Sequence, residues 1–177
     1  NEEQGSTLAA RHLIALGHRN IAYISTDRGV SLSFSVKSRF NVFCDCCRKE
    51  GIEPQIVVCK VDHDGHYQIG DVVTQLMSLP QMPTAIACQE DGIALPLLFQ
   101  LERNGFAVPG DISLIGYDDS FYTNDIGLTT IRQDPAEMAR TAARMTLDLI
   151  QGHELSPAFV DVPAQLVVRS STASVRH

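Results

Sequence analysis

Two carboxylates, Asp118 and Asp119, follow an apolar run at residues 112–115 that ends in Gly116 and Tyr117. In an open α/β sheet, ligands bind beyond the carboxyl ends of the strands, so a strand that ends in hydrogen-bond acceptors is placed to meet a ligand. A turn in which the aspartate side chains bond to nearby backbone explains the same residues. This segment by itself leaves the ligand site and the turn open as alternatives.

Other polar side chains fall at similar positions along the chain. Arg39 opens a predicted helix, Ser33 and Ser35 lie just before it, and Glu90 with Asp91 marks a strand-to-helix turn. If the strands are parallel, these turns share one edge of the sheet. Guanidinium donors, carboxylate acceptors and hydroxyls gathered there would suit a small polyhydroxylated ligand. A surface salt bridge is the simpler explanation for Arg39 taken alone.

Two further clusters could in principle bind a metal. Cys44 and Cys47 share a helix face while Cys46 points elsewhere, and no second cysteine pair lies nearby. Buried cysteines that act as small hydrophobic residues explain this pattern better than a thiolate site. The loop at residues 62–66 holds two histidines and two aspartates, but it is short and lacks a closing partner, which favours a solvated loop. We therefore predict no metal.

No catalytic pattern is present in the sequence. There is no Gly-x-Ser-x-Gly elbow, no Cys/His pair in a recognisable setting, and no glycine pattern of a phosphate loop or dinucleotide fold. An acid–base enzyme that uses Glu90 or Asp118 has no such support. We predict that the chain is not an enzyme and carries no cofactor.

Apolar periodicity predicts strands that alternate with helices. The expected strands are residues 20–25, 55–59, 84–88 and 112–115, and the tail is extended at 159–162 and 165–168. The expected helices are residues 5–16, 36–49, 69–79, 91–103 and 135–150, with a serine-rich loop at 26–38. Strands and helices in this order predict an α/β fold with a mostly parallel sheet covered on both faces.

Composition and charge limit the classes of function that the protein can have. The 177 residues have a net charge of −7 and a pI near 5.2, which does not indicate a nucleic-acid surface. No apolar run is long enough to span a bilayer, and the first residues do not resemble a signal peptide. Five cysteines without scaffold spacing fit a reducing compartment. A cytoplasmic protein is expected.

A set of motifs in order resembles the lac-repressor-type family of transcriptional regulators. They run from residues 1–5, through 10–14, 16–19, 21–24 and 83–86, to 108–119, 128–133 and 166–173. The resemblance implies a type I periplasmic-binding-protein-like fold of two α/β lobes, with an effector in the cleft between them. It assigns residues 1–26 and 131–157 to an incomplete N-terminal lobe, and residues 27–130 and 158–177 to the C-terminal lobe. The helix-turn-helix domain would precede Asn1.

The resemblance also assigns roles by position. Arg39 matches the effector-binding arginine and Asp118 the acceptor aspartate. Ser35, Ser33 and Gln133 match further effector contacts. Glu90 is a departure, because the family commonly has a neutral Asn there; the position of an aromatic ring against the ligand is not matched, and residues 62–67 are the nearest candidates.

The function that the resemblance implies is an effector-sensing and dimerisation core. A small polar effector, a sugar or sugar derivative first of all, would modulate operator binding by a homodimer. The candidate dimer contacts are Leu95, Leu98, Phe99, Phe121 and Tyr122, with ordinary core packing as the alternative for the leucines. A transport-linked solute receptor of the same fold is the second candidate function.

Overall fold

The computed structural model describes residues 1–26, 33–155 and 157–175. Within this part of the chain, one sheet holds six strands in the order β2-β1-β3-β4-β5-β6. The strands are β1 (Ile21–Thr26), β2 (Gln55–Cys59), β3 (Ala85–Cys88), β4 (Ser113–Asp118), β5 (Thr129–Arg132) and β6 (Gln165–Val167). Neighbouring strands from β2 to β5 run parallel, and only β6 pairs antiparallel with its neighbour. The mostly parallel α/β sheet predicted from the sequence is confirmed.

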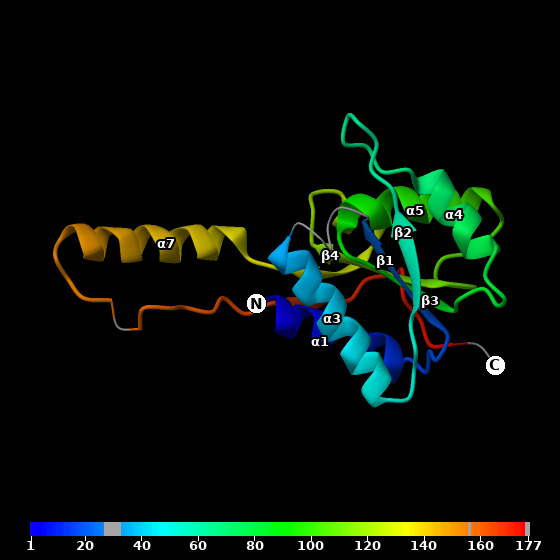
Figure 1. Ribbon diagram of the computed structural model, residues 1–177, viewed down its shortest axis with the longest axis horizontal. Helices are drawn as coiled ribbons and strands as arrows, with labels where there is room; N and C mark the ends of the chain where they lie inside the picture. Colours follow the sequence, from blue (N-terminus) through cyan, green and yellow to red (C-terminus); the bar gives the residue numbers. More distant parts are fainter. Residues whose placement is uncertain (27–32, 156, 176–177) are drawn as a thin grey trace.

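Helices cover both faces of this sheet (Figure 1). The helices are α1 (Glu2–Ala15), α3 (Phe34–Lys49), α4 (Ile69–Met77), α5 (Asp91–Arg103), the short α6 (Thr123–Ile126) and α7 (Pro135–Ile150). One face carries α1 with α3, and the other carries α4 with α5. Residues 27–32 of the serine-rich loop predicted at 26–38 lie outside the described residues. The loop prediction is wrong for residues 34–38, which are helical because the hydroxyl of Ser33 caps α3 and the helix begins at Phe34.

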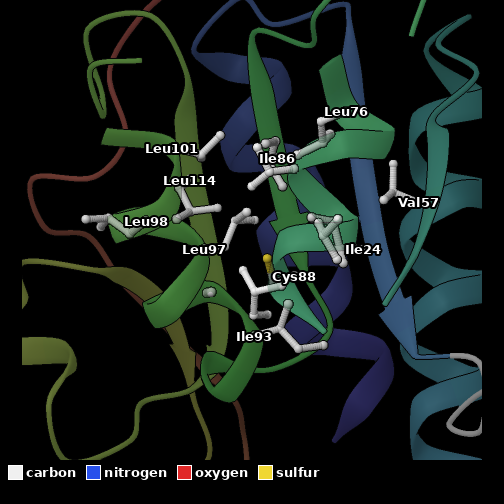
Figure 2. Close-up of a cluster of buried hydrophobic side chains, with 14 of the residues drawn as sticks. Ile24, Val57, Leu76, Ile86, Cys88, Ile93, Leu97, Leu98, Leu101 and Leu114 are labelled. Carbon is white, nitrogen blue, oxygen red and sulfur yellow. The ribbon is translucent and has the colours of Figure 1, made fainter. Parts of the chain in front are cut away.

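The core divides into two layers because successive side chains of a strand point to opposite faces. In β1, Ala22 and Ile24 pack with α4 and α5, while Ile21 and Tyr23 pack with α1 and α3. Figure 2 shows the first layer, in which side chains of the central strands meet those of α4 and α5. All six residues of β1 are buried. A strand covered on both faces has no polar alternation, as its apolar sequence predicts.

The sheet corrects the predicted division into lobes. Residues 1–26 were assigned to a different lobe from residues 27–130, but β1 pairs with β2 on one side and β3 on the other. Helix α1 packs with α3 against the same sheet. Residues 1–26 therefore belong to the same body as β2, β3 and β4. Their apolar faces are covered by the next helix, α3, and by elements farther along the chain, and local sequence patterns do not reveal these partners.

Helix α7 stands apart from this body (Figure 1). Asp134 caps it by accepting a hydrogen bond from the Glu137 backbone N–H at 2.8 Å, and Pro135 fits its first turn. None of its residues is buried, although apolar residues recur at helical spacing, among them Met138 and Leu149. The assignment of residues 131–157 to another lobe stays a prediction for α7, whereas Ile131 is fully buried in the sheet.

Two of the differences from the predicted elements concern β4 and the tail. Strand β4 does not end at Ile115 but continues through Gly116 to Asp118, because these residues pair with β5. The tail has a strand at Gln165–Val167 but none at 159–162. Among the described residues, no helix has both the length and the apolar character that crossing a membrane requires.

Candidate functional site

The carboxyl edge of the parallel strands brings together side chains from five elements. Asp118 is the last residue of β4, Glu90 lies two residues after β3, and Gln133 directly follows β5. Helices α1 and α3 begin at the same edge, which places Glu2 and Arg39 beside these strand ends. The predicted meeting of Arg39, Asp118 and Gln133 is therefore observed in the structure.

Arg39 is the centre of this group. Its Nε lies 2.5 Å from Oε2 of Glu2, and its Nη2 lies 3.3 Å from Oε1 of the same carboxylate. Nη1 donates to the backbone carbonyl of Gln89 at 3.0 Å and lies 3.2 Å from Oδ1 of Asp118. The guanidinium also stacks 3.8 Å over the centre of the Tyr117 ring. With 11% of its side chain exposed, Arg39 is a buried, oriented cation and not a surface salt bridge.

The carboxylate of Glu2 accepts hydrogen bonds from both Arg39 and the side-chain amide of Gln133. Its Oε1 accepts from Nε2 of Gln133 at 3.2 Å, while Oε1 of Gln133 accepts from Nη2 of Arg39 at 3.4 Å. Burial raises the pKa of Glu2, but the hydrogen bond and the charge of Arg39 outweigh burial and leave that pKa below its usual value. Glu2 is thus an ionised member of the site.

Asp118 combines an unusual backbone with a perturbed charge. Its φ is 106°, in the left-handed region that non-glycine residues rarely adopt and that is often retained where function requires it. Burial raises the pKa of Asp118 to about 6; Arg39 opposes this shift, whereas Asp91, Glu90 and Glu2 add to it. A carboxylate that is 39% exposed at the side chain and paired on one side only keeps acceptor capacity for a ligand.

The neighbouring Asp119 has a different role. Its carboxylate lies 2.6 Å from Nε of Arg132 and 2.7 Å from Nη2 of Arg169, and it accepts from the Thr123 hydroxyl at 2.9 Å. Burial by itself would raise the pKa of Asp119. The hydrogen bonds from Arg169 and Arg132 outweigh this effect, so the pKa of Asp119 is lower than usual. Asp119 therefore fastens the tail and β5 to the end of β4.

Asp91 is also structural. It is almost fully buried and accepts from the hydroxyl of Thr130 at 2.7 Å and from the backbone N–H of Ser120 at 2.8 Å. A Cβ at Gly116 would lie 2.1 Å from Oδ1 of Asp91, so the approach of this carboxylate to β4 requires glycine.

Glu90 adds a third carboxylate to the edge. It is half-buried at the start of α5, where it accepts a hydrogen bond from the hydroxyl of Tyr67 and one of 3.4 Å from Nε2 of Gln89. Tyr67 thereby places an aromatic ring from the 62–67 region at the edge, and burial together with Glu90 raises its pKa.

The two serines are less closely engaged. The hydroxyl of Ser33 caps α3 by accepting from the backbone N–H of Val36 at 3.4 Å. Ser35 is half-buried, one helical turn before Arg39. Their assignment as effector contacts stays a prediction.

Sequence reasoning missed Glu2, Gln89 and Tyr117. The first helix was predicted from Gly5, whereas Asn1 caps it and it begins at Glu2. The signal for the earlier start was the Asn-Glu-Glu sequence, a cap followed by acidic residues in a first turn. Gln89 contributes its backbone, which its side-chain type cannot indicate.

The predicted dimer contacts divide by exposure. Leu98 is 6% exposed and belongs to the buried core cluster, which favours ordinary core packing for it, and Leu95 is partly buried against the same cluster. Phe99, Phe121 and Tyr122 are 49%, 86% and 61% exposed, so these three remain candidates.

The cysteine cluster and the loop at residues 62–66 are explained by core packing and by a turn, respectively. Cys44 and Cys47 are buried in the described core as predicted, and burial raises the pKa of Cys44 to about 11. Asp62, Asp64 and His66 offer three ligand atoms within 4.8 Å of one another. The Asp62 carboxylate accepts from the backbone N–H groups of the other two, at 3.0 and 2.9 Å, which makes the cluster a turn.

Comparison with known proteins shows the family to which this fold and site belong. The sequence matches the periplasmic binding protein-like domain over residues 10–172, so the chain belongs to that family. The chain is 31% identical over 179 residues to the HTH-type transcriptional regulator GalR of Escherichia coli, covering 98% of this chain and 50% of the regulator. It spans about half the length of the curated relatives it matches.

Solved structures of regulators have the same fold. A LacI family transcriptional regulator from Enterococcus faecium with bound ribose matches with a TM-score of 0.80 and 27% identity, over 99% of this chain and 64% of that one. A lac repressor dimer bound to operator and the anti-inducer ONPF matches with a TM-score of 0.76 and 27% identity, over 98% and 59%. The predicted resemblance to lac-repressor-type regulators and the predicted fold are both confirmed.

Proposed function

We propose that this protein is the effector-sensing core of a cytoplasmic transcriptional regulator, which binds a small polar effector, a sugar first of all, at the site around Arg39. The observation that carries this proposal is the convergence of Arg39, Asp118 and Gln133 at the carboxyl edge of a parallel sheet. A buried guanidinium next to carboxylate and amide groups can donate to, and accept from, adjacent hydroxyls of one ligand. The ribose in the related regulator structure supports the sugar class.

The cleft would have a second wall. We propose that α7 belongs to an N-terminal lobe whose other elements lie in a part of the protein outside this chain, because the chain spans half the length of its relatives. The exposed apolar residues of α7, such as Leu149 and Ile150, would be covered there. The exposed Phe99, Phe121 and Tyr122 would contribute to a homodimer, a state in which the related lac repressor was solved.

The sensing step is a difference in affinity between two lobe arrangements. An effector that binds one arrangement better shifts the population towards it, and equal binding would shift nothing. Operator DNA would be bound by a domain not contained in this chain, since an acidic chain offers little to phosphates. The transport receptor has less support, because the matched relatives are transcriptional regulators.

The test is a thermal-shift screen against sugars and nucleosides, followed by calorimetry on Asp118→Asn with Asp125→Asn as a control. Asp125 is exposed and carries the same charge, so its variant should bind any hit like the parent. The charge-assisted bond to Asp118 is worth about 1.5–3 kcal/mol, which corresponds to roughly 10- to 150-fold weaker binding in Asp118→Asn. Unchanged affinity in Asp118→Asn would place the effector elsewhere.

A further inference from the structure

The charge of the candidate site is set by a residue that is not among its predicted contacts. Three carboxylates, those of Glu2, Asp118 and Glu90, lie at the same edge of the sheet as the guanidinium of Arg39. Two of them contact the guanidinium directly, and Glu2 does so with both of its oxygens. The charge of Arg39 is therefore already neutralised by carboxylates of the same chain.

We propose, resting on the effector site proposed above, that Glu2 is the specificity-determining residue that restricts this site to uncharged polyhydroxyl compounds and excludes phosphorylated and carboxylated ones. A phosphate group at Arg39 would have to displace Glu2 or lie beside it. Glu2 is held from two sides, by Arg39 and by Gln133, and its side chain is only 19% exposed. Like charges a few ångströms apart in such a partly desolvated site repel strongly.

A neutral ligand does not meet this obstacle. Hydroxyl groups can donate to Asp118 and Glu90 and accept from the amide of Gln133 while the pair of Glu2 and Arg39 stays intact. The pair then acts as a rigid wall of the site. Tyr117, which lies under Arg39, supports this wall from the sheet.

The proposal is tested with inorganic phosphate, because this probe needs no knowledge of the effector. Calorimetric titrations at constant ionic strength would compare the parent, Glu2→Gln, and the double variant Glu2→Gln with Arg39→Met. Glu3→Gln is the matched control, since Glu3 lies in the same helical turn with the same charge but is exposed. Circular dichroism verifies that each variant is folded.

Glu2→Gln should bind phosphate at least about tenfold more tightly than the parent, because removing one charge next to Arg39 leaves the cation free. The double variant and Glu3→Gln should bind like the parent. Equal phosphate binding by the parent and Glu2→Gln overturns the proposal. So does a gain that persists without Arg39, or that Glu3→Gln reproduces.

A second titration, with ribose and ribose 5-phosphate, separates this proposal from the function it rests on. If no sugar or nucleoside binds but Glu2→Gln gains phosphate in an Arg39-dependent way, the effector proposal fails and the role of Glu2 stands. If the parent binds ribose 5-phosphate at this site as tightly as ribose, the role of Glu2 is refuted while the site itself is retained.

Discussion

Replacing Arg39 by methionine tests whether the cluster at the carboxyl edge stabilises the fold. Methionine keeps much of the volume of the side chain and removes its charge and its donors. Both oxygens of Glu2 would then lose their contact with a cation, and Asp118 would lose its cationic partner. The substitution thus leaves carboxylates in a site that is largely closed to water, which is the costly way to break an ion pair.

The magnitude follows from the burial of the partners. The side chains of Arg39 and Glu2 are 11% and 19% exposed, and removing one partner of a buried pair costs about 3–5 kcal/mol. The pairing with Asp118, which is 39% exposed, adds about 1 kcal/mol at most after solvent screening. For a domain of this size the expected loss of about 3–6 kcal/mol lowers the melting temperature by roughly 6–24 °C.

The assay is urea unfolding of the parent, Arg39→Met, Glu2→Gln and the double variant. Removing the stranded charge should recover about 1–2 kcal/mol in the double variant, so the two substitutions should be coupled. A loss below about 1 kcal/mol in Arg39→Met, or additivity within about 0.5 kcal/mol, would refute the account of the cluster as a coupled, buried pair.

Three further variants test neighbouring features. Gly116→Ala should destabilise the fold by about 2–4 kcal/mol, because its Cβ would collide with the buried Asp91, and unchanged urea unfolding would contradict this. Asp119→Ala should lower the free energy of unfolding by a similar amount, roughly 2–4 kcal/mol, because it leaves the largely buried guanidinium of Arg169, whose side chain is 12% exposed, without its carboxylate partner. A loss below about 1 kcal/mol in urea unfolding would show that this ion pair contributes little. The folded-state pKa of Asp118 is about 6, above its unfolded value of about 3.9, so the stability that its protonated form provides is lost as pH rises from 4 to 7. Asp118→Asn should accordingly gain stability over the parent across that range, and a difference that does not vary with pH would argue against the raised pKa.

Local patterns were sufficient for most of the elements. The strand at Gln55–Cys59 was predicted with its observed bounds, and the helix at Pro135–Ile150 was marked by a proline at its start. Both signals depend on residues close in sequence, namely apolar runs and helix caps. The edge of the sheet that carries the site followed from the same information, because parallel strands end on one side.

The partners of each side chain could not be predicted in this way. Asp118 and Asp119 are the same residue type at adjacent positions, yet one faces Arg39 and the other is paired with two different arginines. The left-handed backbone at the end of β4 points the two side chains in different directions, and the return of the tail to β5 brings Arg169 to Asp119. No local pattern encodes either event.

Periodicity and strand ends are local properties, so the sequence alone was enough to predict the class of fold and the edge of the sheet where polar side chains gather. Tertiary packing placed β1 between β2 and β3 in the sheet and α1 against the face of that sheet. It also brought the Glu2 carboxylate into contact with the guanidinium of Arg39, which is 37 residues away in the chain. These outcomes depend on how helices pack across the sheet, which sets the distances between charges that are remote in the chain.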